Sequence, residues 1–184
     1  MSNLRDLTSL KEKYRFEEYD DNYPELYDSE KDRIRKALVG IEIKIHHFGS
    51  TSIKNVGGKG IIDIFIECSQ SDIQEVSKIL VPKLGYEFRA SGGNTNRLFH
   101  QIEIEGRRYH VHLTDFDNDE VIRSLAFRDF LNKRPNLAKE YSDTKRLASV
   151  RAIKMNTRKE MKQVYMATKK SVINKITRMM AKSD

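Results

Sequence analysis

Two groups of residues have the types and spacing that phosphate chemistry needs. Gly49 and Ser50 follow an alternating apolar run over residues 41–48. Glycine lets backbone N–H groups approach phosphate oxygens closely, and a serine hydroxyl adds a donor. Asp63 lies in the next apolar run, residues 61–66, where an unpaired carboxylate is costly unless it lies at the strand end or binds a cation. An ordinary loop also explains a Gly-Ser pair, and the downstream acid is what favours a phosphate and cation site.

A second set of polar residues lies on a hairpin predicted over residues 97–114, with its turn at residues 105–107. Alternation along the two strands places Glu103, His110 and His112 on one face. Imidazoles beside a carboxylate could bind a transition metal, hold a phosphate when protonated, or move protons. Histidines that only pack or face solvent explain the same pattern.

Helical and strand periodicities predict the elements that position these residues. Asn22-Tyr23-Pro24 is typical of a helix start, and Gly40 is expected to end that helix. The expected elements are a helix over 24–38, strands over 41–48 and 61–67, a helix from 71 to Pro82 or shortly after it, a strand over 84–88, and helices over 122–130, 136–149 and 157–180.

The last predicted helix carries an apolar stripe that is typical of a core or of a contact with another helix, and not of a cofactor site. The stripe consists of Met161, Val164, Tyr165, Thr168, Val172, Ile176 and Met179.

Composition limits the class of protein. The 184 residues are 38% hydrophobic and 33% charged, which predicts one ordered globular domain with a real core. The one cysteine, Cys68, excludes an internal disulfide framework and a cysteine-rich zinc module and fits a reducing compartment. The sequence has no apolar stretch of membrane-spanning length and no signal-peptide core near Met1, so we expect a cytoplasmic protein without a membrane partner.

Positive charge gathers at the end of the chain. The net charge is +7, and residues 151–184 hold ten Lys and Arg against Glu160 and Asp184. A solvated helix face explains this, as does a contact with nucleic acid, an acidic membrane surface or an acidic partner. Tyr165 is the only aromatic residue in that segment, so the segment offers little aromatic surface on which bases could stack. We therefore predict no specific nucleic-acid binding.

The succession of strand, Gly-Ser, loop, strand and Asp resembles the signature of the nucleotidyltransferase superfamily, and within it the chain closely resembles the GrpB family. The resemblance extends over residues 19–176. Its segments are Tyr19-Asp20, Pro24–Tyr27, His46–Ser52, Lys59–Ile64, Leu84–Tyr86, Arg97–Phe99, His110–Leu113, Leu125–Leu131, Pro135, Tyr141, Lys145 and Leu147-Ala148. Members of this family also occur fused to dephospho-coenzyme A kinases, which implies a nucleotide-related context.

The resemblance implies an α+β fold, with a nucleotidyltransferase-like mixed β-sheet flanked by helices and a C-terminal helical part. We expect a single domain over residues 1–184, with the core sheet over about 19–117 and the helices over about 118–182. It also implies a nucleotide or another phosphate-bearing small molecule as ligand, with Mg²⁺ or Mn²⁺. The residues expected to bind that ligand are Gly49, Ser50, Thr51, Ser52, Lys59, Arg97 and Lys145.

One position departs from the superfamily pattern, in which two carboxylates two residues apart hold two magnesium ions. Asp63 fills the first position, but the second is Phe65, which cannot bind a metal. Glu67 lies on the same face one step beyond Phe65 and could join only a looser site.

Two functions remain open on these residues. In a transferase, Asp63 would hold the cation, with Glu67, His110 and His112 as further metal ligands, and Glu103 or His112 would act as the base. In the alternative, the chain is a catalytically degenerate scaffold whose basic C-terminal helix binds a partner.

Overall fold

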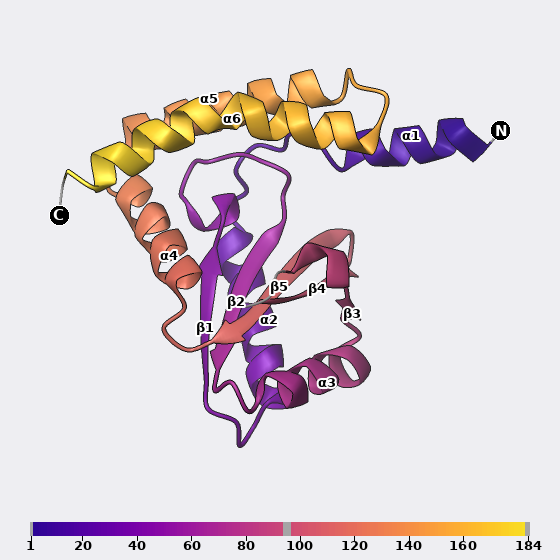
Figure 1. Ribbon diagram of the computed structural model, residues 1–184, viewed down its shortest axis with the longest axis vertical. Coiled ribbons are helices and arrows are strands. Elements are labelled where there is room, and N and C mark those ends of the chain that lie inside the picture. Colours follow the sequence, from indigo (N-terminus) through magenta and orange to yellow (C-terminus); the bar gives the residue numbers. More distant parts are fainter. Residues whose placement is uncertain (1, 94–96, 183–184) are drawn as a thin grey trace. The chain divides into compact units, whose positions relative to one another are not determined.

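The computed structural model describes residues 2–93 and 97–182, and its chain divides into two compact units. The helical unit holds Met1–Asp20, Ile53–Gly60 and Phe127–Asp184, and the sheet unit holds Asp21–Ser52 and Ile61–Ala126. The single domain over residues 1–184 stays a prediction. The elements are α1 (Ser2–Glu12), α2 (Tyr23–Ala37), β1 (Ile43–Phe48), η1 (Ser50–Ser52), β2 (Ile62–Cys68), α3 (Ile73–Leu84), β3 (Glu87–Phe88), η2 (Ala90–Gly92), β4 (Leu98–Ile104), β5 (Arg107–Asp115), α4 (Asp119–Asn132), α5 (Pro135–Ala152) and α6 (Arg158–Met180) (Figure 1).

The five strands form one mixed sheet in the order β1-β2-β5-β4-β3. The β2–β5 pair is parallel, and the other three pairs are antiparallel. This sheet and helices α4, α5 and α6 confirm the predicted α+β class with a C-terminal helical part. Because β2 and β5 are parallel, the starts of both strands lie side by side, and Asp63 is paired with His110.

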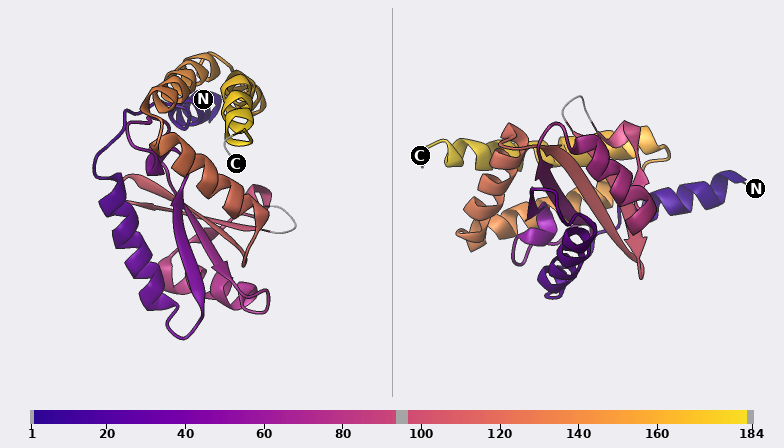
Figure 2. Two further views of the ribbon diagram at one scale, coloured as in Figure 1. Left: turned by 90° about the vertical axis from the view of Figure 1, so that its left-hand side faces the viewer. Right: turned by 90° about the horizontal axis from the view of Figure 1, so that it is seen from below.

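Helices α2 and α3 pack on the sheet, α2 against β2 and α3 against β5 and β3 (Figures 1 and 2). Successive side chains of a strand point to opposite faces, and Ile62, Ile64 and Ile66 of β2 are fully buried. Helix α3 continues through Pro82 and ends at Gly85, whose φ of 72° lets the chain leave the helix.

The hairpin of β4 and β5 places its side chains on the predicted faces. Ile102 pairs with Tyr109 and Glu103 with Arg108, so the side chain of Glu103 lies on the same face as those of His110 and His112. The turn between the strands has positive φ at two successive residues, 50° at Glu105 and 76° at Gly106, which is typical of a tight hairpin turn.

The buried Glu30, a contact not predicted from the sequence, pairs with Arg33 within α2 and links α2 to Tyr86 after α3. The Glu30 carboxylate is buried and accepts two 2.8 Å hydrogen bonds from the Arg33 guanidinium. The Tyr86 hydroxyl donates to Glu30 over 2.6 Å. Burial raises the pKa of Tyr86 well above its usual value, and Glu30 raises it further. The tyrosine therefore remains a donor at neutral pH.

The helical unit is built around two apolar clusters. From the predicted stripe of α6, Met161 and Tyr165 belong to one cluster and Val172 and Ile176 to the other. The prediction was wrong at the end of the stripe, where Met179 is 39% exposed and the next residue, Met180, packs on the cluster instead. Successive residues of an α-helix lie 100° apart around its axis, so spacing in the sequence can assign the last position of an apolar stripe to the wrong neighbour.

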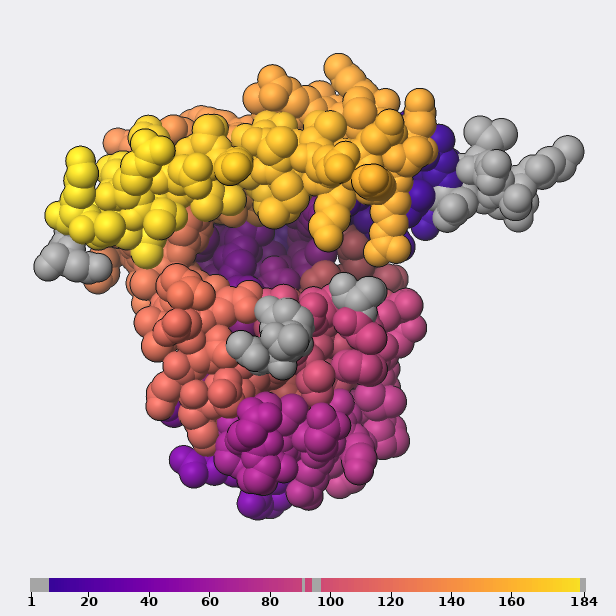
Figure 3. All heavy atoms as spheres, in the orientation of Figure 1, coloured from indigo at the N-terminus to yellow at the C-terminus, as the bar shows by residue number. Residues whose placement is uncertain are grey.

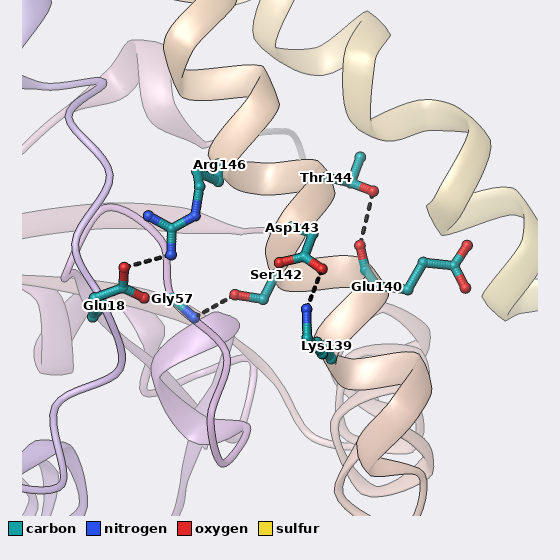
Figure 4. A network of polar contacts seen from close by, with 8 residues as sticks. All are labelled: Glu18, Gly57, Lys139, Glu140, Ser142, Asp143, Thr144 and Arg146. Atoms are coloured by element: carbon teal, nitrogen blue, oxygen red, sulfur yellow. Dashed lines mark hydrogen bonds and ion pairs between the residues drawn. The ribbon is translucent and has the colours of Figure 1, made fainter.

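Polar contacts hold the segment over residues 53–60 and the segment between α1 and α2 to α5 within the helical unit (Figure 4). The Gly57 N–H donates to the Ser142 hydroxyl over 3.0 Å, and Arg146 pairs with Glu18.

Both helices α5 and α6 carry basic residues on their outer surface. In α6 (yellow in Figure 3), Lys159, Lys162 and Lys170 are exposed, which fits a solvated face.

Within residues 2–93 and 97–182, none of the helices combines the length and apolar character that crossing a bilayer requires.

His100 generates a prediction about stability and pH. It is fully buried on β4, its Nε2 lies 2.8 Å from the Ser77 hydroxyl, and burial lowers its pKa from 6.5 to about 4. Between pH 6.5 and 4 the unfolded chain binds a proton that the folded protein excludes, so stability falls as pH falls through this window, by up to about 3 kcal/mol. His100→Gln removes the titration and keeps a partner for Ser77.

We therefore expect urea unfolding of the His100→Gln variant to lose less stability between pH 6.5 and 4 than the unchanged protein does. The acid titration of His112 is common to both proteins, so the difference between them isolates His100. Identical pH profiles for the two proteins would show that His100 does not titrate as a buried group.

Candidate functional site

One face of the sheet combines polar and aromatic side chains, and we call it the polar face. Strand registers and alternation place on it residues from β1, β2, β5 and β4. Its members are Lys44, His46, Phe48, Asp63, Phe65, Glu67, Phe99, Gln101, Glu103, Arg108, His110 and His112.

Three predicted site residues come together on this face. Asp63 pairs with His110 across the parallel strands, and His110 Nδ1 lies 3.4 Å from Asp63 Oδ1. His112 follows two residues later on the same face. Asp63, His110 and His112 each offer one ligand atom, and these atoms lie within 4.8 Å of one another. We call this group the triad.

His112 is the member of the triad with the most apolar surroundings. Its ring centroid lies 5.2 Å from that of Phe48, 5.6 Å from Phe65 and 5.0 Å from Phe99. Its Nδ1 atom is buried and has no hydrogen-bond partner within the described part of the chain. Burial lowers the pKa of His112 to about 3, although the Asp63 carboxylate acts in the opposite direction. The imidazole is therefore neutral at pH 7.

Phe65 occupies the position at which the resemblance described above would place a second carboxylate. Its side chain is fully buried, and its ring stacks on Phe48 with centroids 3.8 Å apart. A carboxylate at this position would lie among aromatic rings without water. The face is therefore built to carry one strand carboxylate beside the loop, at Asp63.

Gly49 is required by its contact with Asp63. Its φ is 74°, and a Cβ atom there would overlap Asp63 Oδ2 and lie 3.1 Å from Asp63 Cγ. Both the backbone angle and the lack of space select glycine. The first residue of the Gly-Ser pair thus brings the loop backbone directly against the carboxylate.

The three hydroxyl residues after Gly49 have different roles. Thr51 donates to the Ile61 carbonyl over 2.9 Å, and its oxygen lies 3.0 Å from Nε2 of His47. Ser52 donates to the Gly49 carbonyl over 2.7 Å. These two hydroxyls shape the loop, whereas Ser50 makes no side-chain hydrogen bond to any other residue that the structure describes. Ser50 is therefore the hydroxyl of the turn that can serve a ligand.

Glu67 lies outside the triad. It is buried and accepts hydrogen bonds from His46 Nε2 over 2.7 Å and from the Asp117 N–H over 3.1 Å. Four residues of strand separate it from Asp63, which corresponds to about 13 Å. Its carboxylate instead connects β1, β2 and the segment before α4.

Glu103 shares the polar face but is also distant from the triad. It is exposed and pairs with Arg108, whereas the residue opposite His112 is Phe99. The residue opposite His110 is Gln101, two residues or about 7 Å along the strand from Glu103, and Asp63 lies one further strand, about 5 Å, beyond His110. Glu103 is therefore too far from Asp63 to exchange a proton directly with a group bound there.

Arg97 begins the hairpin and has a guanidinium that is only partly paired. It forms an ion pair with Glu120 at the start of α4 and donates to the Gly92 carbonyl over 3.4 Å. Its Nε atom is buried without a partner in the described residues. The positive charge of Arg97 contributes to the low pKa of His112, after the larger effect of burial. Arg97 lies two residues before Phe99, the residue opposite His112, so alternation places it on the face of the triad.

Lys59 and Lys145 belong to the helical unit. The Lys59 ammonium lies 3.9 Å from the ring centroid of Tyr14 and 4.5 Å from that of Tyr165. Lys145 is buried, and its ammonium lies 5.4 Å from the ring centroid of Tyr141. Contacts with aromatic rings stabilise both cations.

The aromatic shell around His112 was not predicted from the sequence. Phe48 is two residues from His46, and Phe99 is two residues from Gln101. Because residues two apart on a strand share a face, the sequence could have predicted that both rings lie on the polar face. Their contact with His112 also needs the order of the strands, which no local pattern contains.

Comparison with known proteins identifies relatives. The family model described as GrpB protein matches residues 13–179. The UPF0157 protein YqkA of Bacillus subtilis is 35% identical over 128 residues, which cover 70% of this chain and 37% of that protein. The glutamate-rich protein GrpB of Alkalihalophilus pseudofirmus is 28% identical over 134 residues, which cover 70% of this chain and 76% of that protein. This chain thus spans little more than a third of the Bacillus protein.

A solved structure shares the fold. The crystal structure of the conserved protein GrpB from Enterococcus faecalis superposes with a TM-score of 0.69 at 26% identity, covering 88% of this chain and 98% of that one.

The contact between Gly49 and Asp63 can be tested by substitution. Gly49→Ala adds a methyl group at a positive φ and against a carboxylate, so we expect a loss of about 2–4 kcal/mol in the free energy of unfolding. Gly106→Ala is the matched control, because its φ is 76° and nothing lies within 4 Å of its Cβ position. It should lose about 1–2 kcal/mol.

The excess cost at Gly49 should become smaller in an Asp63→Ala background, because the carboxylate is removed and only Cβ of residue 63, 3.1 Å from the added methyl group, remains. A double-mutant cycle by urea unfolding measures this difference. Equal losses for Gly49→Ala and Gly106→Ala would contradict the close approach of the loop to Asp63.

Proposed function

The chain belongs to the GrpB family, and from this premise we propose that its polar face binds a nucleotide or another phosphate-bearing small molecule. The phosphate would lie at Gly49 and Ser50, beside Asp63, with one divalent cation such as Mg²⁺ or Mn²⁺.

The single observation that carries this proposal is the approach of the Gly49 backbone to the Asp63 carboxylate. A phosphate held at the turn would lie next to a carboxylate of the same charge. The two anions repel unless a cation lies between them. The loop and the carboxylate together therefore suit a phosphate ligand whose divalent cation also binds Asp63.

Two further side chains have suitable roles. Ser50 carries the hydroxyl in the turn that the loop itself does not use, and it can donate to a phosphate oxygen. Arg97 presents a planar guanidinium, which pairs well with phosphate, and Glu120 holds it in place. Lys59 and Lys145 remain proposed phosphate ligands from the family resemblance.

Binding is better supported than nucleotidyl transfer. Transfer forms a bond from an acceptor oxygen to the α-phosphorus, breaks the bond to pyrophosphate and needs a base for the acceptor proton. Glu103 is distant from Asp63, and a histidine with a pKa of about 3 is a weak base at neutral pH. Phe65 removes the second ion that the superfamily uses.

A scaffold that binds a partner is the second candidate. The observation that favours it is the full burial of Phe65, because a face packed in this way has lost the two-ion arrangement. The partner would be acidic and would contact the exposed lysines of α6.

Ligand binding can be measured as a thermal shift with nucleotides and coenzyme A precursors, each with and without Mg²⁺ or Mn²⁺. A ligand present at about 100 times its dissociation constant stabilises the folded state by about 2.7 kcal/mol, which corresponds to roughly 5–10 °C for a protein of this size. Asp63→Asn should abolish the metal-dependent part of the shift. Ser50→Ala should weaken binding about tenfold, since it removes one hydrogen bond to a charged group.

Ser71→Ala is the matched control, because Ser71 is an exposed serine beyond the opposite end of β2. It should leave the shift unchanged. A protein that gives no shift with any phosphate compound would contradict ligand binding, and a shift that survives Asp63→Asn would locate the site elsewhere.

A further inference from the structure

The donor atoms of the triad point to a particular class of cation. Asp63 offers a carboxylate oxygen, and His110 and His112 each offer an imidazole nitrogen. Mg²⁺ prefers oxygen ligands and keeps most of its water, whereas imidazole suits zinc, iron, cobalt, nickel and copper. We propose that the triad is a site for one transition-metal ion, bound by two histidines and one carboxylate.

The backbone builds this site without help from a flexible loop. His110 and His112 are two residues apart on β5, so both project from one face. The parallel register places Asp63 directly beside His110. A tight turn at Glu105 and Gly106 determines the register of the hairpin. Sites built on strands hold their ligands more precisely than sites on loops.

The distances between the ligand atoms of the triad allow all three to bind the same ion. Atoms bound to one metal at about 2.0–2.2 Å are roughly 3–3.5 Å apart. The separation of His110 Nδ1 from Asp63 Oδ1 is already 3.4 Å, and the ligand atoms of the triad lie within 4.8 Å of one another. Closing the largest of these separations takes side-chain shifts of little more than about 1 Å.

The surroundings of His112 favour a metal ligand over a hydrogen-bonded histidine. A buried ring nitrogen without a partner costs free energy, and Nδ1 of His112 is such an atom within the described residues. The triad takes one ring nitrogen from each histidine, and a metal ion on Nδ1 of His112 would remove that cost. Phe48, Phe65 and Phe99 surround the ring and exclude water from that side.

The site holds a single ion. Phe65 occupies the position from which a second strand carboxylate would bind another metal, and Glu67 is committed to His46 and to the Asp117 N–H. The inference names the cation of the proposed phosphate site, but the triad is complete within the protein, so the ion binds without any phosphate compound. Metal binding and phosphate binding can therefore fail separately.

The test uses the full chain, freed of metal with a chelator, and titration calorimetry with Zn²⁺, Co²⁺, Mn²⁺ and Mg²⁺ in the absence of nucleotide. We expect one site per chain, with Zn²⁺ and Co²⁺ bound at least about 100-fold more tightly than Mg²⁺. Bound Co²⁺ should add a visible absorption band that reports nitrogen and oxygen ligands.

His110→Gln and Asp63→Asn should each weaken Zn²⁺ binding at least about tenfold, because losing a direct ligand costs more than losing an outer partner. His46→Gln is the matched control: it removes a histidine from the same face, outside the triad, and should leave the affinity unchanged. Circular dichroism checks that each variant is folded.

Absence of Zn²⁺ and Co²⁺ binding would overturn the inference, and the triad would then be a hydrogen-bonded carboxylate and histidine pair. Loss of binding in His46→Gln but not in His110→Gln would also overturn it, by moving the ion to His46 and Glu67. A thermal shift with nucleotide and Mg²⁺ alongside no Zn²⁺ binding would leave the proposed function standing without this inference.

Discussion

A carboxylate that leaves water for the surface of a sheet must find a replacement for its solvent. Asp63 meets this constraint at the start of β2, with the Gly49 backbone on one side and His110 on the other. The loop must turn through glycine, β5 must run parallel to β2, and the hairpin must present its histidines to the same face. Together these features form the surroundings of that one side chain.

The aromatic shell complements the carboxylate. Phe65 stacks on Phe48, and both lie near His112 together with Phe99. This packing keeps the His112 imidazole neutral and removes a second acidic ligand. The same packing therefore lines one side of the proposed ion site with aromatic rings.

Local patterns predicted most elements because their causes are local. Alternation predicted the hairpin and the face that Glu103 shares with His110, and Pro24 marked the start of α2. The distance of Glu103 from His112 and the isolation of Glu67 could not be predicted, because they depend on which strands pair and in which register. The assignment of Lys59 to the helical unit, beside Tyr14 and Tyr165, likewise depends on contacts between segments far apart in sequence.

The central claim is that one ion at the triad and one phosphate at the Gly49 turn share a single site. Paramagnetic relaxation of ³¹P in a nucleoside triphosphate, measured with Mn²⁺ bound to the protein, tests this most directly, because the effect falls steeply with the distance between ion and phosphorus. The account predicts strong relaxation of at least one phosphate, which diamagnetic Zn²⁺ abolishes by displacing Mn²⁺. Bound nucleotide whose phosphates are not relaxed by bound Mn²⁺ would contradict it.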